Sequence, residues 1–212
     1  MKNTEKNNPR NDKSLHAGSL KVGEISKMIE SSYTGDYKNV DEYVFMPNIS
    51  TIFLQVYKNI MLKQIVVVLR GSVEIKDWLL NKKLWNDKKA EDYRVKVIRN
   101  IITLLKKQYP DYKITTLGHS LGGFLASLMP DQVFESIGLN SYIPKSKIFE
   151  KISDNEYLVR SDADIPSLLN KAQRRKNVKT IPRESMDPLK EHSWKVINRL
   201  GKEEVIGRKM SL

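Results

Sequence analysis

A glycine-flanked serine, set between a strand-like and a helix-like apolar run, constrains the fold of this chain more than any other feature. Residues 114–129 read ITTLGHSLGGFLASLM, and Gly118 to Gly122 match the pattern G-x-S-x-G. The pattern requires a sharp turn between a strand and a helix, which strains the serine backbone and leaves no room for neighbouring Cβ atoms. It predicts that Ser120 presents an exposed hydroxyl at the start of a helix. The alternative is a serine that merely caps this helix.

The segments on either side alternate between helical and strand-like spacing of apolar residues. Helices are predicted at residues 20–32, 89–108, 146–152 and 191–200. Strands are predicted at residues 51–58, 63–72, 112–118, 132–140, 155–161 and 178–182. The first two strands, joined by a polar turn around Asn59, are expected to form a hairpin. This order predicts an α/β fold with a mostly parallel central sheet flanked by helices, in one compact domain at residues 19–212.

Residues 1–18 are polar, and we expect them to form a disordered leader. They lack the apolar core of a secretory signal, and no other run approaches the roughly 18 apolar residues that span a bilayer. The sequence therefore favours an intracellular protein, or a virion-associated one if the source is viral. The chain contains no cysteine, which excludes disulfides, thiolate metal sites and a cysteine nucleophile.

The chain carries a formal net charge of +12, from 37 Lys and Arg against 25 Asp and Glu. Such an excess attracts anionic partners, either nucleic acid or an anionic membrane surface. The densest basic stretch, KAQRRKNVK at residues 171–179, has no interleaved aromatic residues on which bases could stack. We interpret it as a solvated basic face. Nucleic acid is therefore not an expected partner, whereas peripheral contact with an anionic membrane stays open, as does the oligomeric state.

A nucleophilic serine needs a base, and the chain offers three histidines. His16 lies in the polar leader, and His119 is expected to point away from the serine hydroxyl, which leaves His192. Its position downstream of the serine agrees with the order Ser, Asp or Glu, His of hydrolases with this turn. Asp162 and Asp164 follow a predicted strand between serine and histidine, and either could orient the imidazole.

Acyl transfer also needs hydrogen-bond donors for the negative charge that develops on the carbonyl oxygen. The backbone N–H of Leu121, at the start of the helix, is one candidate. A second is expected in a loop after an earlier strand, where VVVLRGS ends with Ser72. This set of groups requires no metal and no organic cofactor.

These blocks together resemble the class 3 lipases, the fungal-type triacylglycerol lipase family of the α/β-hydrolase fold. YPDYKITTLGHSLGGFLASL at residues 109–128 is very similar to the family's serine turn. VVVLRGS followed by KDWLLN, within residues 66–81, is similar to its earlier apolar strand and the block after it. The resemblance implies that Ser72 and Leu121 donate their backbone N–H groups to an oxyanion hole.

Downstream, DIPSLL resembles the acid-bearing loop of the family and favours Asp164 over Asp162, while the HSW that begins at His192 resembles its histidine segment. The resemblance implies a serine carboxylic-ester hydrolase that acts on lipid acyl esters, of lipase or phospholipase type, through Ser120, His192 and Asp164. The chain departs from the family at Asn81, where an aspartate is usual, and lacks its H-x-G-F block.

Several alternatives remain open at this point. A thioesterase or an acyltransferase would use the same three residues, and the sequence does not separate these from an esterase. EIKDWLLNKKLWNDKK, residues 74–89, mixes tryptophan and leucine with lysines, as a lid or an interfacial segment would, but an ordinary core-packing helix fits the pattern equally. In a different class of function, the net charge alone suggests a non-catalytic, hydrolase-like scaffold that binds an anionic partner.

Overall fold

The computed structural model of this chain describes residues 16–72, 88–141, 153–164 and 178–199. Several sequence predictions lie outside these residues and stay predictions. They are the leader up to residue 15, the lid or interfacial segment up to residue 87 with Asn81, the short helix at 146–152 and the basic stretch up to residue 177.

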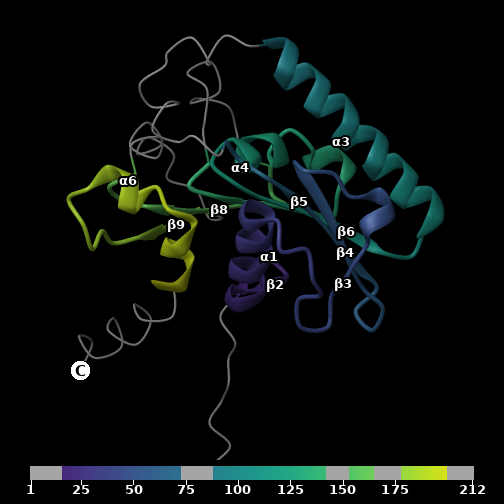
Figure 1. The fold of residues 1–212 in the computed structure, drawn as a ribbon, viewed down its shortest axis with the longest axis horizontal. Helices are drawn as coiled ribbons and strands as arrows, with labels where there is room; N and C mark the ends of the chain where they lie inside the picture. The colour runs from purple at the N-terminus through teal and green to yellow at the C-terminus, as the bar shows by residue number, and fades with distance from the viewer. Residues whose placement is uncertain (1–15, 73–87, 142–152, 165–177, 200–212) are drawn as a thin grey trace, which may run out of the picture.

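A seven-stranded sheet with the order β3-β4-β5-β6-β7-β8-β9 forms the centre of the described chain (Figure 1). β3, β4 and β5 pair antiparallel, and the pairs from β5 to β9 are parallel. This mostly parallel sheet confirms the predicted α/β fold, and β4 with β5 is the predicted hairpin. The strands are β3 Val44–Phe45, β4 Leu54–Asn59, β5 Gln64–Leu69, β6 Lys113–His119, β7 Glu135–Leu139, β8 Glu156–Ser161 and β9 Val178–Ile181.

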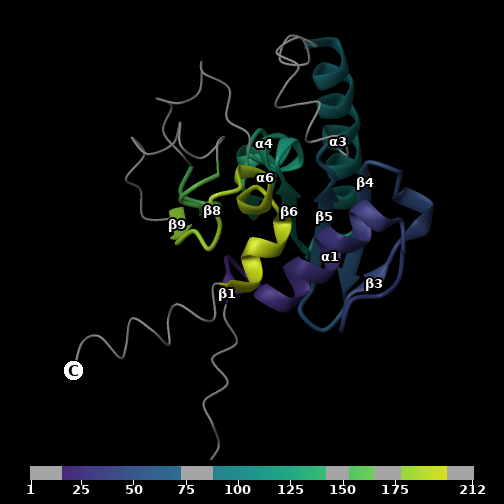
Figure 2. The same ribbon diagram turned by 60° about the vertical axis from the view of Figure 1, so that its left-hand side comes forward.

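Helices cover both faces of the sheet (Figures 1 and 2). Helix α1 packs on one face together with the 3-10 helix η5, and α3 and α4 pack on the other. None of the described helices is long and apolar enough to cross a membrane. The bounds are α1 Val22–Thr34, α3 Lys88–Gln108, α4 Leu121–Ala126, α6 Pro188–Glu191 and η5 Trp194–Arg199, with short 3-10 turns at Pro47–Ile49 and Pro130–Gln132 and a small pair β1 His16–Ala17 with β2 Leu20–Lys21.

Strand β5 shows why a continuous apolar run lies at the sheet centre. All of its residues are buried. Val66 and Val68 pack into the core beneath α1, whereas Ile65, Val67 and Leu69 pack into the core beneath α3 and α4. Neither side of β5 meets water, so neither side needs polar residues. Burial of each of these side chains contributes about 1.5–3 kcal/mol.

The prediction of one closing α-helix at residues 191–200 is wrong. The chain there consists of the end of α6, a short turn and the 3-10 helix η5. Side chains of Asn140 and His119 bind the backbone carbonyls of residues 191–193. A continuous α-helix would need these carbonyls for its own hydrogen bonds, so the tertiary contacts replace it.

Candidate active site

Ser120 occupies the sharp turn between β6 and α4 that the sequence predicts. Its backbone has φ 56° and ψ −122°, and a positive φ is strained for a residue with a Cβ atom. Its N–H donates to the carbonyl of Leu139 on β7, at 3.0 Å. The Ser120 side chain makes no capping hydrogen bond to the described helix α4. The N-cap alternative is therefore wrong, and the hydroxyl is turned elsewhere.

The expectation of an exposed serine is also wrong, because Ser120 is only 1% exposed. Two neighbours lie close to it. The imidazole of His192 lies against the hydroxyl. On another side, a Cβ atom added at Gly71, just after β5, would lie 3.3 Å from the Cβ of Ser120.

The two glycines of the G-x-S-x-G pattern hold strand and helix close together. A Cβ atom at Gly118 would lie 2.2 Å from the backbone carbon of Gly122. A Cβ atom at Gly122 would lie 2.0 Å from the backbone oxygen of Leu69 on β5. Both contacts are with backbone, which cannot rotate away as a flexible side chain can. Glycine is therefore required at both positions for α4 to start where it does.

Replacing Gly122 with alanine is expected to lower the free energy of unfolding by about 3 kcal/mol, because β5 and α4 must move apart to admit the methyl group. Denaturant titration measures this change. Gly23 in α1 provides the matched control, since a Cβ atom there meets nothing within 4 Å. Gly23→Ala should leave stability unchanged or slightly raised. Equal stability of Gly122→Ala and the wild type would contradict the close approach.

Three predicted site residues from separate segments meet at the carboxyl end of the sheet. The hydroxyl of Ser120 lies 2.9 Å from Nε2 of His192, and Nδ1 of His192 lies 2.5 Å from Oδ1 of Asp164. They are 1%, 1% and 0% exposed, respectively. An Nδ1–H that donates to the carboxylate leaves Nε2 free to accept the serine proton. This is the geometry that activates a serine for attack on an acyl group.

The structure separates the two aspartates between which the sequence pattern alone did not decide. Asp162 is exposed, and its backbone N–H donates to the carbonyl of Ile181 on β9, at 2.9 Å. Asp164 lies two residues further, beyond the turn that follows β8, and its carboxylate is fully buried against the imidazole. Asp164, favoured by the family resemblance, is thus the aspartate in contact with His192.

His119 links helix α1 to the backbone of His192. Its Nε2 donates to the carbonyl of His192 at 2.7 Å, so its Nδ1 accepts the hydroxyl proton of Tyr33 at 2.8 Å. Burial, and then the nearby charge of His192, lower the pKa of His119 to about 3. His119 is therefore neutral at physiological pH. As expected, the ring nitrogens of His119 do not bind the Ser120 hydroxyl but bind Tyr33 and the backbone of His192. His119 is thus a structural link.

Asn140 holds the backbone on both sides of His192, a role that no motif in the sequence indicates. It follows β7 with a positive φ of 43°, a conformation that asparagine tolerates better than most residues. Its Nδ2 donates to the carbonyl of Glu191 at 2.8 Å and to that of Ser193 at 3.3 Å. Its Oδ1 accepts the N–H of Ser161 at the end of β8, at 2.9 Å. One side chain thus ties the His192 segment to two strands.

The buried carboxylate of Glu191 anchors the same segment from the other side. It accepts the N–H groups of Glu184 and Ser185 at 3.1 and 2.9 Å, and the guanidinium of Arg199 at 2.8 Å. Burial opposes its ionisation, but the hydrogen bonds from Arg199, Ser161 and the Glu184 backbone prevail and lower the pKa of Glu191 to about 2. Glu191 stays charged at neutral pH and fixes the residue before His192.

One predicted oxyanion donor follows Ser120 directly, and the other follows Gly71, a neighbour of Ser120. Leu121 is the first residue of α4, where a backbone N–H has no partner within the helix. Ser72 is half-buried and follows Gly71, which packs directly against Ser120. Arg70 has a structural contact, because its guanidinium donates to the carbonyl of Ile52 at 3.2 Å.

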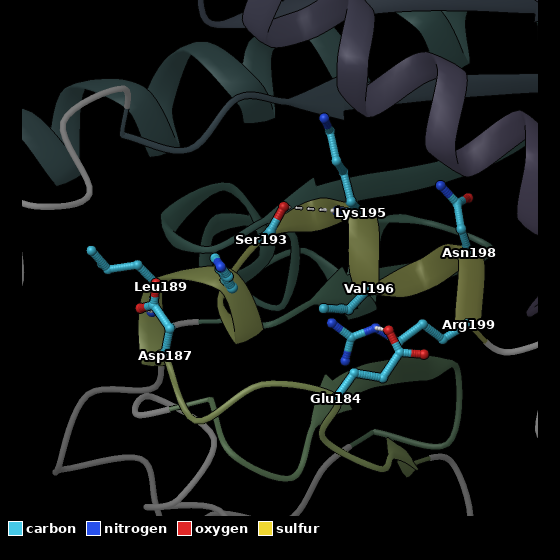
Figure 3. A pocket seen from close by; sticks show the side chains of 9 residues that line it. Glu184, Asp187, Leu189, Ser193, Lys195, Val196, Asn198 and Arg199 are labelled. Carbon is cyan, nitrogen blue, oxygen red and sulfur yellow. Dashed lines mark hydrogen bonds and ion pairs between the residues drawn. The ribbon is translucent and has the colours of Figure 1, made fainter.

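A hollow of about 630 Å³ is lined by residues of the segment that carries His192 (Figure 3). Its walls come from residues 184–199 and carry both signs of charge, with Arg199 paired to Glu184 at 3.2 Å. Ser120, His192 and Asp164 are not among its lining residues. We therefore do not assign this hollow to the ester substrate. Within the described ranges, no group of three or more histidine or acidic side chains could hold a metal ion.

Comparison with known proteins places the chain in a family. Residues 18–141 match the sequence profile described as Lipase (class 3). This match covers more than half of the 212 residues. Comparison with curated protein sequences gave no match.

Solved lipase structures share the fold. The lipase of Rhizomucor miehei, in complex with its propeptide, is 18% identical with a TM-score of 0.52, over 69% of this chain and 62% of that one. Lipase II from Rhizopus niveus is 14% identical with a TM-score of 0.50, over 70% and 72% of the two chains. A triacylglycerol lipase whose catalytic centre is a serine protease triad is 17% identical with a TM-score of 0.50, over 71% and 72%. The chain thus spans less than two thirds of the Rhizomucor protein.

Proposed function

This chain belongs to the class 3 lipase family, a family of serine carboxylic-ester hydrolases, and we propose that it cleaves acyl esters of lipids. One observation carries the proposal. Ser120, His192 and Asp164 come from three distant segments and converge with the serine hydroxyl 2.9 Å and the carboxylate 2.5 Å from the two ring nitrogens of one imidazole. Such an arrangement suits acyl transfer.

In the proposed reaction, Nε2 of His192 takes the proton of Ser120 as its Oγ attacks the carbonyl carbon of the ester. Asp164 stabilises the imidazolium, and the N–H groups of Leu121 and Ser72 bind the oxyanion. Collapse of the tetrahedral intermediate breaks the bond to the alcohol, which leaves with the proton from Nε2. Water then attacks the acyl-serine by the same route, releasing the carboxylic acid and restoring Ser120.

The substrate class follows from the family and the charge of the chain. We propose neutral glycerides or phospholipids as substrates, and the net charge of +12 favours anionic phospholipid surfaces. A panel of glyceride esters of increasing chain length, beside anionic phospholipid vesicles, tests this. Turnover of glycerides without any turnover of the vesicles would contradict the phospholipase form of the proposal.

The non-catalytic scaffold is the competing proposal, and a fluorophosphonate probe separates the two. The probe forms a covalent bond with an activated serine, so we expect stoichiometric labelling of the wild type. Ser120→Ala should remain unlabelled. Folded wild-type protein that fails to react would favour the scaffold.

Asn140→Gly is expected to lower kcat about 10- to 100-fold with little change in KM. Glycine keeps the positive φ but deletes the contacts that hold the His192 backbone, and small displacements of a catalytic base are costly. The split between kcat and KM on a soluble ester is the readout, because a merely structural role would change stability alone.

Asn155 offers a matched control for this variant. Its Nδ2 also lies within bonding distance of three backbone carbonyls, those of Pro130, Val133 and Phe134, at the opposite end of the sheet. Asn155→Ala should therefore cost stability but leave kcat unchanged. A similar fall of kcat in both variants would argue against a positioning role for Asn140.

A further inference from the structure

The turn between β4 and β5 exposes three consecutive large apolar side chains. Ile60, Met61 and Leu62 are 61%, 86% and 60% exposed. This differs from the polar turn expected around Asn59. Turns are normally built from glycine, proline, asparagine, aspartate and serine, so three apolar residues at a turn need an explanation. Single exposed apolar residues need none, but a cluster marks a site of interaction.

Hydrogen bonds fix the backbone of this turn, so its three apolar side chains extend into solvent from a defined position. The pair Asn59 and Gln64 closes the hairpin. The side chain of Asn59 accepts the N–H of Leu62 at 2.9 Å, and the carbonyl of Lys63 accepts the N–H of Lys113 on β6 at 2.8 Å. The backbone that carries the apolar side chains is therefore fixed at this end of the sheet.

Lysines and one more exposed aromatic ring surround the turn. Phe134, just before β7, is 47% exposed, and the ammonium of Lys113 lies 4.6 Å from its ring centre. Lys58 lies 4.9 Å from the ring centre of Tyr109, just beyond α3. We call Ile60, Met61, Leu62, Lys63, Lys113 and Phe134 the hairpin-tip surface. Lys58 and the last turn of α3, with Lys106 and Lys107, add further positive charge beside it. With Lys63 and Lys113 these lysines carry five positive charges. They outnumber the three negative charges on nearby loops, which belong to Glu42, Asp111 and Asp131.

We propose that the hairpin-tip surface is a membrane-binding site that inserts its apolar side chains into an anionic phospholipid surface. Exposed apolar residues ringed by lysines match the boundary between acyl chains and anionic headgroups. A lysine side chain lies with its methylenes along apolar groups and its ammonium at the phosphates. A projecting turn is too small for a stable protein interface, which buries about 800 Å² on each partner. A bilayer needs no complementary pocket.

This surface lies at the opposite end of the sheet from the proposed catalytic residues. Lys63 and Lys113 stand at the amino ends of β5 and β6, whereas Ser120 follows the carboxyl end of β6. The seven residues of β6 separate the two ends by roughly 23 Å. Binding through the hairpin tip therefore directs the catalytic end away from that membrane, so hydrolysis of phospholipids in the same membrane requires a separate encounter through the catalytic end. The inference goes beyond the proposed ester hydrolysis and does not depend on it.

Two exposed methionines allow a direct test with the whole 212-residue chain. The chain has no cysteine, so Met61→Cys and Met186→Cys each give one site for an environment-sensitive nitrobenzoxadiazole label. Met61 is 86% exposed at the hairpin tip, and Met186 is 80% exposed on the segment before α6, near the catalytic end. Vesicles of phosphatidylcholine with phosphatidylglycerol should shift the emission of the Met61 probe to the blue. The Met186 probe should shift much less than the Met61 probe, and phosphatidylcholine alone should have little effect.

Unlabelled variants give the expected magnitudes. Ile60→Ser with Leu62→Ser should weaken vesicle binding at least about tenfold, and Lys63→Gln or Lys113→Gln about fivefold each. Turnover of a soluble ester by the same variants should be unchanged, so failure of this surface is distinguishable from failure of the catalytic proposal. A response of the Met186 probe alone would overturn the inference in favour of contact at the catalytic end. A Met61 probe already shifted without vesicles, or a dimer that Met61→Asp dissociates, would overturn it in favour of a protein partner.

Discussion

Ser120→Ala should lower kcat for ester hydrolysis by about 10⁵-fold and leave a folded protein. The loss is this large because, in the proposed reaction, the hydroxyl forms the bond to the acyl carbon, and the residual rate comes from oxyanion binding alone. Removal of Oγ leaves the backbone contacts of Ser120 intact, including the N–H that donates to Leu139 and the carbonyl that accepts from Phe124. The strained φ of 56° remains, so stability should change little.

Ser127, just after the end of helix α4, which begins after Ser120, is the matched control. Its hydroxyl is bound to the carbonyl of Phe124 at 2.7 Å, an ordinary local contact. Ser127→Ala should retain activity within about twofold, because a substitution at a half-buried position away from the proposed site usually has only a small effect on the fold. Kinetics on a short soluble ester, combined with intact-mass analysis after fluorophosphonate treatment, measure both variants. Ser120→Ala protein that retained more than a few per cent of the wild-type rate would refute the assigned nucleophile.

The features that the sequence predicted well are encoded locally. The serine turn follows from a strand, two glycines and a helix within 16 residues. The central strand follows from five consecutive apolar residues at Ile65–Leu69, since only a strand covered on both faces accommodates such a run. In both cases the residues that cause the structure are neighbours in the chain, so pattern and outcome coincide.

The features that the sequence did not predict depend on contacts between distant segments. Asn140 is 51 residues from Glu191, and nothing in its surroundings in the chain indicates that its amide will bind that carbonyl. The same contact, with that of His119, explains why residues 191–200 do not form one helix despite their helical spacing. The neighbours of Ser120 likewise include Gly71 and His192, which approach from elsewhere in the fold.

Asp164→Asn should lower kcat by about 10³- to 10⁴-fold while KM changes little. The carboxylate accepts the Nδ1 proton of His192 at 2.5 Å and thereby keeps Nε2 unprotonated. An asparagine can present its NH₂ group to Nδ1 instead, which favours the tautomer with the proton on Nε2. That tautomer cannot accept the proton of Ser120. The side chain keeps its size, so packing around this fully buried position is preserved.

Asp162→Asn is the control that isolates this effect, because it makes the same chemical change two residues away on an exposed side chain. It should retain nearly full activity, since the contact of this residue with Ile181 is made by its backbone N–H. The ratio of the two kcat values therefore measures the orienting role of one carboxylate and cancels any effect of lost negative charge at this end of the sheet. Equal losses in both variants would mean that charge near the site, and not the bond to Nδ1, sustains the reaction. A loss confined to Asp162→Asn would transfer the role to the exposed aspartate and would require this loop to rearrange when substrate binds.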